Sequence, residues 1–385
     1  MDADRYTDSE FGSPRRLPGP HGYTTYLPKP IPRQIELPAS TVSALAEAEG
    51  ALGQLAGIGR LVPNPDLLIR PYLLREALSS TRIEGTQASM AEVLEADASG
   101  EAPSADIEEV LNYMEAMRAG IARLDQLPIS VRLICELHGS LLAGVRGREL
   151  SPGELRRSPN WIGPAGSTIN SAPFVPPPPE ELPALLSDWE KFAHEQPEMP
   201  LLVQNALLHA QFETIHPFLD GNGRLGRLLL VFLLVARGRI DAPLLYLSAY
   251  LERNRDSYYD CLQAVRERGD PIPWVELFLA AVRTQSVDAV ERAGAIIDLR
   301  ERYREIALEV GGPNAAPLVE LICRNPIATG PSVVRSLGVS RPTALRLLDR
   351  MEQQGILTEA ATGPRGERRY VAEEMMRAVS GDEDE

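Results

Sequence analysis

Residues 216–227 read HPFLDGNGRLGR, and the rest of the chain is organised around this stretch. Its glycines allow the backbone to approach an anion closely. The start of a helix adds free N–H groups and a positive dipole end. Arg224 and Arg227 are three residues apart, so both can point toward that end of the helix, where guanidinium groups suit phosphate. The almost wholly apolar run 228–236 predicts a buried helix that anchors the turn.

Two other side chains of this stretch carry metal-binding or acid–base chemistry. Asp220 offers the hard oxygen ligands that Mg²⁺ prefers when it accompanies phosphates. His216 titrates near neutral pH and could take a proton from a hydroxyl group. The alternative is a Gly/Asn loop that caps a core helix, with its charges merely solvated. The combination of residue types favours a site for a polyphosphate, a metal ion and a proton acceptor.

The stretch resembles the Fic family signature H-P-F-x-[D/E]-G-N-G-R-x-x-R and matches it at every defined position. The resemblance implies a Mg²⁺-dependent enzyme that transfers AMP from ATP to a Ser, Thr or Tyr hydroxyl of a target protein. It also implies that His216 is the catalytic base and that Asp220 binds Mg²⁺. The phosphate- and ATP-binding positions that it implies are Gly221, Asn222, Gly223, Arg224 and Arg227.

Composition limits the class of protein. The 385 residues predict two or three domains, and the net charge of −15 argues against a globally basic nucleic-acid binder. Residues 1–20 lack the apolar region of a signal peptide, and the longest apolar run is too short to span a bilayer. Cys135, Cys261 and Cys323 are scattered, which fits reduced thiols in a cytoplasmic protein without a membrane partner.

Six segments are predicted along the chain, and the fold class is mainly α. Pro- and Gly-rich composition marks the first segment, and apolar residues at helical spacing mark the domains that follow. The segments are an irregular N-terminal arm (1–38), an N-terminal helical domain (39–104), a Fic-type helical core with a β-hairpin flap (105–285), a linking helix (286–312), a winged helix-turn-helix domain (313–373) and an acidic tail (374–385).

A helix expected to end near residue 80 leads into the sequence SSTRIEG at residues 79–85. Ser80 and Glu84 share one face of such a helix. An ordinary polar helix terminus is the alternative, but the sequence also resembles the [S/T]-x-x-x-E-[G/N] inhibitory motif of Fic proteins. This resemblance implies that Glu84 pairs with Arg227 and keeps the ATP γ-phosphate from binding productively, because both compete for one guanidinium group.

Residues 153–179 contain two short strand-like pieces around a Gly/Pro/Ser loop, which predict a β-hairpin. In Fic proteins the corresponding flap holds the target side chain by strand addition, so the resemblance implies target docking here. A plain surface loop is the alternative. The predicted docking residues are Asn160, Trp161 and Ile162.

The run 254–262 also resembles the Fic core, where the corresponding helix lines the adenine and ribose pocket. The candidates on this helix are Tyr258, Tyr259 and Leu262, with core packing an equal alternative for each aromatic residue. His138 and His209 lie in apolar helical patterns, so we expect packing roles for both.

The C-terminal part predicts three helical pieces and a strand–turn–strand pattern. Ser340 is the expected N-cap of the second helix of a helix-turn-helix, and residues 363–366 are the expected wing turn. Eight Arg and five acidic residues between positions 313 and 372 make this part locally +3. A recognition helix for DNA and a module for protein contact are both open.

The sequence therefore predicts an autoinhibited protein adenylyltransferase. Its expected partners are an unknown target protein and the protein itself through autoadenylylation, with a homodimer and DNA contact as further possibilities. One alternative is the reverse reaction, in which Glu84 orients a water molecule that removes AMP. Another is a DNA-binding regulator whose Fic core has lost its activity.

Overall fold

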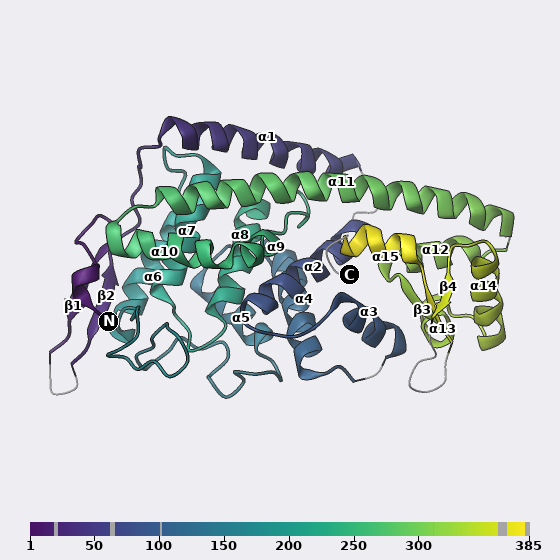
Figure 1. The fold of residues 1–385 in the computed structure, drawn as a ribbon, viewed down its shortest axis with the longest axis horizontal. Coiled ribbons are helices and arrows are strands. Elements are labelled where there is room, and N and C mark those ends of the chain that lie inside the picture. Colours follow the sequence, from purple (N-terminus) through teal and green to yellow (C-terminus); the bar gives the residue numbers. More distant parts are fainter. Residues whose placement is uncertain (19–21, 62–65, 101, 311, 361–367, 382–385) are drawn as a thin grey trace.

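The computed structural model describes residues 1–18, 22–61, 66–100, 102–310, 312–360 and 368–381. They form a mainly helical protein with two small sheets (Figure 1), which confirms the predicted fold class. The helices up to the end of the long α11 are α1 (Ala39–Leu61), α2 (Asp66–Ile83), α3 (Met90–Ser99), α4 (Ala105–Arg123), α5 (Val131–Leu141), α6 (Leu182–His194), α7 (Leu201–Ile215), α8 (Asn222–Ala236), α9 (Ser248–Arg253), α10 (Arg255–Arg268) and α11 (Ile272–Val310), with short 3₁₀ turns at Ala3–Arg5 and Pro179–Glu181.

Helix α7 is the most deeply buried helix of the core. Every residue from Leu202 to Ile215 is buried, and these include polar side chains such as His209 and Glu213. Trp189 of α6 donates to the Leu208 carbonyl (2.9 Å), and Trp274 of α11 donates to the Ala206 carbonyl (2.7 Å). These indole groups fix α7 against both neighbours, so the loop that follows it starts from a rigid position.

Helix α11 connects the core to the C-terminal module. Its 39 residues span about 58 Å at 1.5 Å per residue, and α1 packs along it (Figure 1). The linking helix predicted for residues 286–312 is therefore the second half of one continuous helix that begins in the core.

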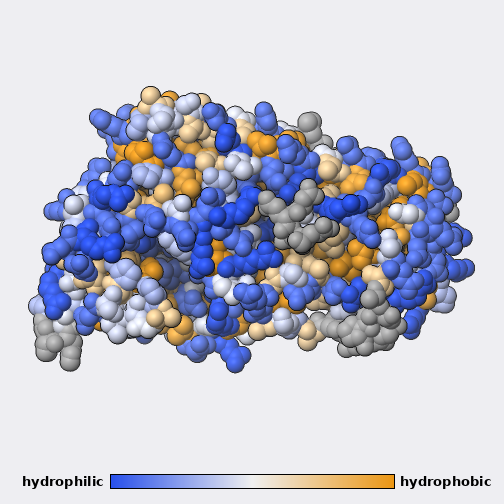
Figure 2. All heavy atoms as spheres, viewed as in Figure 1, coloured by the Kyte–Doolittle hydropathy of each residue, from blue (hydrophilic) through white to orange (hydrophobic). Residues whose placement is uncertain are grey.

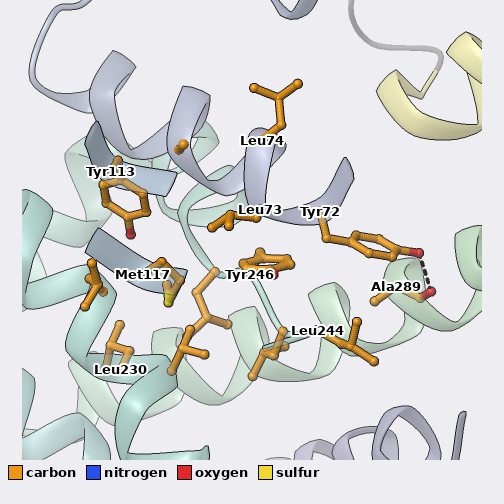
Figure 3. Close-up of a cluster of buried hydrophobic side chains, with 14 of the residues drawn as sticks. Tyr72, Leu73, Leu74, Tyr113, Met117, Leu230, Leu244, Tyr246 and Ala289 are labelled. Carbon is orange, nitrogen blue, oxygen red and sulfur yellow. Dashed lines mark hydrogen bonds between the residues drawn. The ribbon is translucent and has the colours of Figure 1, made fainter. Parts of the chain in front are cut away.

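Figure 3 shows the apolar cluster that anchors α2, α4, α8 and α11 to one another. The Tyr72 and Tyr246 rings stack with centroids 6.0 Å apart, and the Tyr72 hydroxyl donates to the Ala289 carbonyl (2.7 Å). Met117 and Leu230 are buried in the same cluster. Each such side chain contributes about 1.5–3 kcal/mol through burial. The packing therefore fixes α2 firmly against the core.

We expect the substitution Gly120→Ala to lower the free energy of unfolding by about 1–3 kcal/mol. A methyl group at this position of α4 would overlap Phe232 of α8 and Leu137 of α5. Gly53→Ala is the matched control, because Gly53 lies exposed on α1 with no neighbour within 4 Å; there alanine should raise stability by up to about 1 kcal/mol. Urea unfolding measures both. A Gly120→Ala variant as stable as the control would contradict the packing of these helices.

The N-terminal arm, predicted to be irregular, contains a regular β-hairpin. Strands β1 (Gly12–Arg16) and β2 (Thr24–Pro28) pair antiparallel, with Gly12 opposite Pro28. Tyr26 of β2 donates its N–H to the Val175 carbonyl (2.9 Å). Pairing with the second half of the flap gives these residues a partner for their backbone groups, which the Pro/Gly content alone did not indicate.

The predicted flap hairpin is reduced to a single bridge. Ile162 and Phe174 exchange both backbone hydrogen bonds (2.9 and 3.3 Å), and no strand is assigned in the described part of the flap. Prolines stand at 164, 173 and 176–179. Because proline has no N–H to donate, pairing cannot extend past the bridge.

The C-terminal module contains the three helices and the two later strands that the sequence predicts, with a further short strand between the first two helices. Its elements are α12 (Ala315–Arg324), β3 (Ile327–Thr329), α13 (Gly330–Leu337), α14 (Arg341–Gln353), β4 (Thr358–Ala360) and β5 (Arg369–Val371). The strands form an antiparallel sheet in the order β3-β5-β4. The expected wing turn at 363–366 lies outside the described residues. Ser340 precedes α14 as expected, but its hydroxyl lies 2.9 Å from Thr343 Oγ1 rather than capping the backbone.

The first half of the predicted acidic tail is helical. Residues Glu373–Ser380 form helix α15, which packs against α11 and buries Met375 and Val379. The two apolar side chains are four residues apart and so share one face. Residues 382–385 lie outside the described part of the chain.

The surface is mostly hydrophilic, with apolar residues scattered over the face shown in Figure 2. Among the described residues, we find no helix with both the length and the apolar character needed to cross a membrane.

Candidate active site

The signature stretch forms a loop between two buried helices. Helix α7 ends at His216, whose φ of +47° places it in the left-handed region, and α8 begins after Gly221 at φ +75°. The Asn222 side chain accepts from the Phe218 N–H and donates to the Phe218 carbonyl, both at 2.9 Å. Asn222 therefore shapes the loop with its side chain, which leaves only its backbone N–H for the predicted phosphate contact.

His138 holds the same loop from α5. Its Nδ1 accepts from the Gly153 N–H (2.8 Å), so its Nε2 carries the proton and donates to the Asp220 carbonyl (2.9 Å). The ring stacks on Phe218 at 3.8 Å between centroids. Both ring nitrogens are used, which agrees with the expected packing role of this histidine.

Arg156 holds the carbonyl groups at the end of α7. It donates to the carbonyls of His216 (2.8 Å) and Ile215 (3.2 Å), and to the Pro177 carbonyl of the flap (2.6 Å). Burial lowers the pKa of the Arg156 guanidinium to about 10. A buried arginine bound by carbonyl oxygens fixes the left-handed backbone of His216, because those carbonyls have no helical partner.

The imidazole of His216 is neutral at physiological pH. Burial lowers its pKa to about 3, and the positive Arg156 and Arg266 act in the same direction. Its Nδ1 is fully buried and has no hydrogen-bond partner among the described residues. Only Nε2 is then available to a substrate, in the unprotonated ring that a general base requires.

Asp220 combines a bound oxygen with an accessible one. Its Oδ1 accepts from the Gly221 N–H (2.7 Å), whereas Oδ2 lies 3.9 Å from Arg224 Nη2 and the side chain is about one-third exposed. The described residues contain no group of three His, Cys, Asp or Glu side chains arranged around a metal position. A single carboxylate fits Mg²⁺ that is held mainly by phosphate oxygens and water.

Arg224 lies beside a buried carboxylate. Its Nη1 lies 3.4 Å from Oε2 of Glu109, a buried residue of α4 that also accepts from the Thr86 hydroxyl (2.7 Å). Both charged side chains are almost wholly buried. The contact uses Nη1, whereas Nε of Arg224 has no partner among the described residues, so the phosphate contact stays a prediction.

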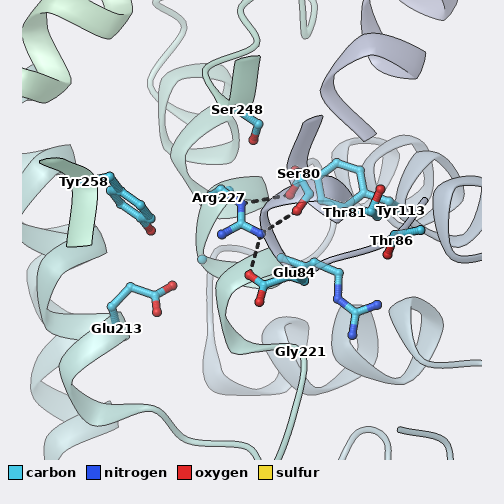
Figure 4. A network of polar contacts seen from close by, with 12 residues as sticks. Ser80, Thr81, Glu84, Thr86, Tyr113, Glu213, Gly221, Arg227, Ser248 and Tyr258 are labelled. Atoms are coloured by element: carbon cyan, nitrogen blue, oxygen red, sulfur yellow. Dashed lines mark hydrogen bonds and ion pairs between the residues drawn. The ribbon is translucent and has the colours of Figure 1, made fainter. Parts of the chain in front are cut away.

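Arg227 is bound by the predicted inhibitory segment, Ser80 to Glu84 (Figure 4). Its Nε donates to the Ser80 hydroxyl (2.9 Å), and its Nη2 donates to the Ser80 carbonyl and to Glu84 Oε1 (both 2.8 Å). Burial is the largest single influence and lowers the pKa of Arg227, but Glu84, Tyr258 and Tyr259 together raise it above its ordinary value.

The Glu84 carboxylate also covers the start of α8. A methyl group in place of the Gly223 hydrogen would overlap Glu84 Oε1 and lie 2.9 Å from Arg227 Nη1. Gly223 belongs to the first turn of α8, where free N–H groups attract anions. Glu84 thus occupies the place where the sequence predicts the outer phosphates of a nucleotide.

The three predicted adenine-side residues differ in their surroundings. Tyr258 is buried and its hydroxyl lies 2.8 Å from Nε2 of His209, while Leu262 is part of the apolar core. His209 has Gly226 O within 3.1 Å of its other nitrogen, so it is a packing histidine as expected. Of the three, only Tyr259 is exposed, at 42%. Partial burial raises the pKa of its hydroxyl group, Glu84 raises it further and Arg227 lowers it. Tyr259 is the one candidate that a nucleotide could reach.

The flap residues hold the signature loop rather than standing free. Asn160 Nδ2 donates to the carbonyls of Phe218 and Leu219 (both 3.3 Å). Trp161 is 43% exposed, and its indole N–H donates to the Ser167 carbonyl of its own loop (2.9 Å). The flap is therefore connected to the loop that carries His216.

Two segments of the chain match family models. Residues 42–122 match the Fic/DOC family N-terminal model, and residues 128–234 match the Fic/DOC family model. These two segments belong to the Fic/DOC family. The Fic signature loop and the predicted inhibitory segment lie within them.

Several known proteins resemble the chain. It is 34% identical over 99 residues to a probable protein adenylyltransferase of Aquifex aeolicus, covering 26% of this chain and 28% of that protein. It is 32% identical over 218 residues to the protein adenylyltransferase Fic of Drosophila yakuba, covering 54% of this chain and 40% of that protein. The chain thus spans less than half of the length of these curated relatives.

Solved structures share the Fic fold. A Fic family protein from Desulfovibrio desulfuricans superimposes with a TM-score of 0.58 at 22% identity, covering 88% of this chain and 97% of that one. A Fic domain containing signaling protein from Bacteroides thetaiotaomicron gives a TM-score of 0.52 at 21% identity, covering 66% of this chain and 97% of that one.

Three residues of the Fic domain site were missed from sequence. Arg156 and Glu109 are both charged and buried, and Glu213 of α7 lies 4.0 Å from His216. A charged residue inside a mostly apolar helical pattern was a sequence signal for Glu213, whereas Glu109 lies in a helix with several other charged residues. Arg156 lies in a polar loop and gave no such signal.

Proposed function

We propose that this protein is an adenylyltransferase that moves AMP from ATP to a Ser, Thr or Tyr hydroxyl of a protein, and that Glu84 restrains it. One observation carries the proposal. A single short loop joins neutral His216 to the glycine-capped start of α8, so a base and an anion-binding helix terminus are held side by side. The relatives from Aquifex aeolicus and Drosophila yakuba are named a probable protein adenylyltransferase and a protein adenylyltransferase, which supports the same activity.

The chemistry follows from this arrangement. The N–H groups of the first turn of α8 bind the phosphates, and Arg227 exchanges Glu84 for phosphate oxygens. The target hydroxyl oxygen attacks the α-phosphorus, the bond to the β-phosphate oxygen breaks, and pyrophosphate leaves. His216 takes the hydroxyl proton at Nε2. Asp220 would hold Mg²⁺, which when bound neutralises phosphate charge.

Removal of AMP is a second candidate function, and it is favoured by one observation. The Glu84 side chain is about one-third exposed while it contacts Arg227, so one face of the carboxylate is open to water. In that reaction Glu84 would orient a water molecule toward the phosphorus of an AMP-modified side chain. The two reactions use the same residues and differ in what Glu84 does.

The test uses ATP labelled at two different phosphates. We expect label from the α-phosphate to remain on protein after denaturation and label from the γ-phosphate to be lost, because only AMP is transferred. The Glu84→Gly variant provides sufficient signal, and mass spectrometry of the labelled peptide locates the modified hydroxyl. Retention of γ-label without α-label would instead indicate phosphoryl transfer and would overturn the proposal.

A further inference from the structure

Two fully buried polar atoms without partners lie on the last turn of α7. They are Oε1 of Glu213 and Nδ1 of His216. The other oxygen of Glu213, Oε2, lies 4.0 Å from His216 Nδ1. Buried polar groups are nearly always hydrogen-bonded, so two unsatisfied groups beside each other call for a functional explanation.

The fold provides a dedicated space for the Glu213 carboxyl group. A methyl group on Gly226 of α8 would overlap Glu213 Oε1, and Phe212 and His209 line the same space. The glycine at this position of the signature stretch therefore lets α8 approach α7 with the carboxyl group between them. A core position that only needed filling would take an apolar side chain, since burying a carboxyl group costs free energy.

Charged groups from three elements face Glu213. Arg227 of α8 and Arg266 of α10 favour its ionised form, whereas Glu84 of the inhibitory segment disfavours it. The Tyr258 hydroxyl also faces it but already lies against His209. Burial outweighs the two arginines and raises the pKa of Glu213 to about 7. The carboxyl group can therefore lose its proton near physiological pH.

The tautomer of His216 decides whether it can act as a base. Nε2 can accept a hydroxyl proton only if the neutral ring carries its hydrogen on Nδ1. Nδ1 is fully buried 4.0 Å from Glu213 Oε2, and the backbone carbonyl of Glu213 is the other acceptor that acts on the His216 ring. A carboxylate beside Nδ1 selects this tautomer and stabilises the imidazolium ion that forms when Nε2 takes the proton.

We propose that Glu213 is the positioning residue of the catalytic base. Its carboxylate accepts the Nδ1–H of His216, leaves the Nε2 lone pair directed at the target hydroxyl, and balances the positive charge after proton transfer. Arg156 fixes the backbone of His216 by binding the His216 and Ile215 carbonyls. Because this backbone is fixed, only the side chains of Glu213 and His216 need to rotate to bring Oε2 and Nδ1 into hydrogen-bond distance. This role rests on the proposed function of the site.

Kinetics in the Glu84→Gly background test this role. We expect kcat for AMP transfer to rise with pH through the titration of Glu213, with an inflection below about 7, because the Glu84 carboxylate that helps to raise the pKa of Glu213 is absent in this background. Glu213→Gln keeps the size of the side chain and should lower kcat by at least about 10-fold, remove the inflection and leave KM for ATP within about 3-fold. Glu213→Asp should recover part of the rate. A Glu213→Gln variant with unchanged kcat and unchanged pH profile would overturn the proposal.

Nuclear magnetic resonance tests the same role without any activity. The chain has five histidines, and the His216→Ala spectrum identifies the His216 ring signals by difference. We expect the Nδ1–H tautomer at His216 in the wild type and a mixture of tautomers in Glu213→Gln. The same tautomer mixture in both proteins would refute the role of Glu213 even if AMP transfer is confirmed. Absence of AMP transfer with the tautomer difference present would count only against the proposed reaction.

Discussion

Replacement of Glu84 by glycine is expected to increase self-labelling with ATP by about 10- to 100-fold. The Glu84–Arg227 contact is a charge-assisted hydrogen bond at 2.8 Å to a fully buried guanidinium group. Such bonds contribute about 1.5–3 kcal/mol, and each 1.4 kcal/mol corresponds to a factor of ten. Removing the carboxylate also clears the space over Gly223. Nucleotide phosphates then gain both the N–H groups of α8 and the freed side chain of Arg227.

Two matched variants separate the carboxylate from its surroundings. Glu84→Gln keeps the shape and a hydrogen-bond acceptor but loses the charge, so we expect labelling between the wild type and Glu84→Gly. Glu115→Gln removes a carboxylate from an exposed ion pair with Arg118 on α4 and should leave labelling unchanged. If Glu84→Gly labels no better than the wild type, the inhibitory role of the segment is wrong.

The same variant discriminates between addition and removal of AMP. Protein that Glu84→Gly has labelled can be incubated with unlabelled wild type. Release of AMP by the wild type and not by Glu84→Gly would support the reverse reaction, because only the wild type has the Glu84 carboxylate to orient water. If the label persists in both incubations, Glu84 inhibits AMP transfer but does not support AMP removal.

The site could be predicted from sequence where its parts are contiguous. His216, Gly221 and Arg227 fall within one loop and the helix after it, so local geometry brings them together without any knowledge of the fold. The contacts of Arg227 with Ser80 and with Glu84 join residues that are 147 and 143 positions apart. Only the resemblance to the family indicated it, because periodicity carries no information about distant partners.

The parts that could not be predicted depend on tertiary packing. Arg224 pairs with Glu109, which lies 115 positions earlier, and its contact with phosphate stays a prediction. The Asn222 side chain turns back to its own loop. Adenine contact by Tyr259, homodimer formation and a cytoplasmic location stay predictions. DNA contact also stays a prediction. Arg346 is exposed on α14, and its described contacts are with neighbours on the same helix, so it is the kind of side chain that could reach a phosphate.

Replacement of His216 by alanine in the Glu84→Gly background is expected to lower AMP transfer by about 100- to 10,000-fold, the usual contribution of a positioned general base. ATP binding should be little affected, because the phosphate-binding groups lie in α8. Equilibrium binding of ATP by calorimetry and single-turnover labelling measure the two steps separately. His194→Ala is the control, since His194 is exposed on α6 and its Nε2 lies 2.6 Å from the Ile129 carbonyl; it should retain the full rate.

The same substitution has a predicted effect on stability that depends on pH. The pKa of His216 is about 3 in the folded protein, below its ordinary value of 6.5, so between these values the unfolded chain binds the extra proton. The wild type must then lose stability as pH falls from 6.5 toward 3. His216→Ala lacks this contribution and should lose less over that range in urea unfolding. Equal losses in both proteins would mean that His216 is not held neutral by burial, and with that its role as a ready base would fail.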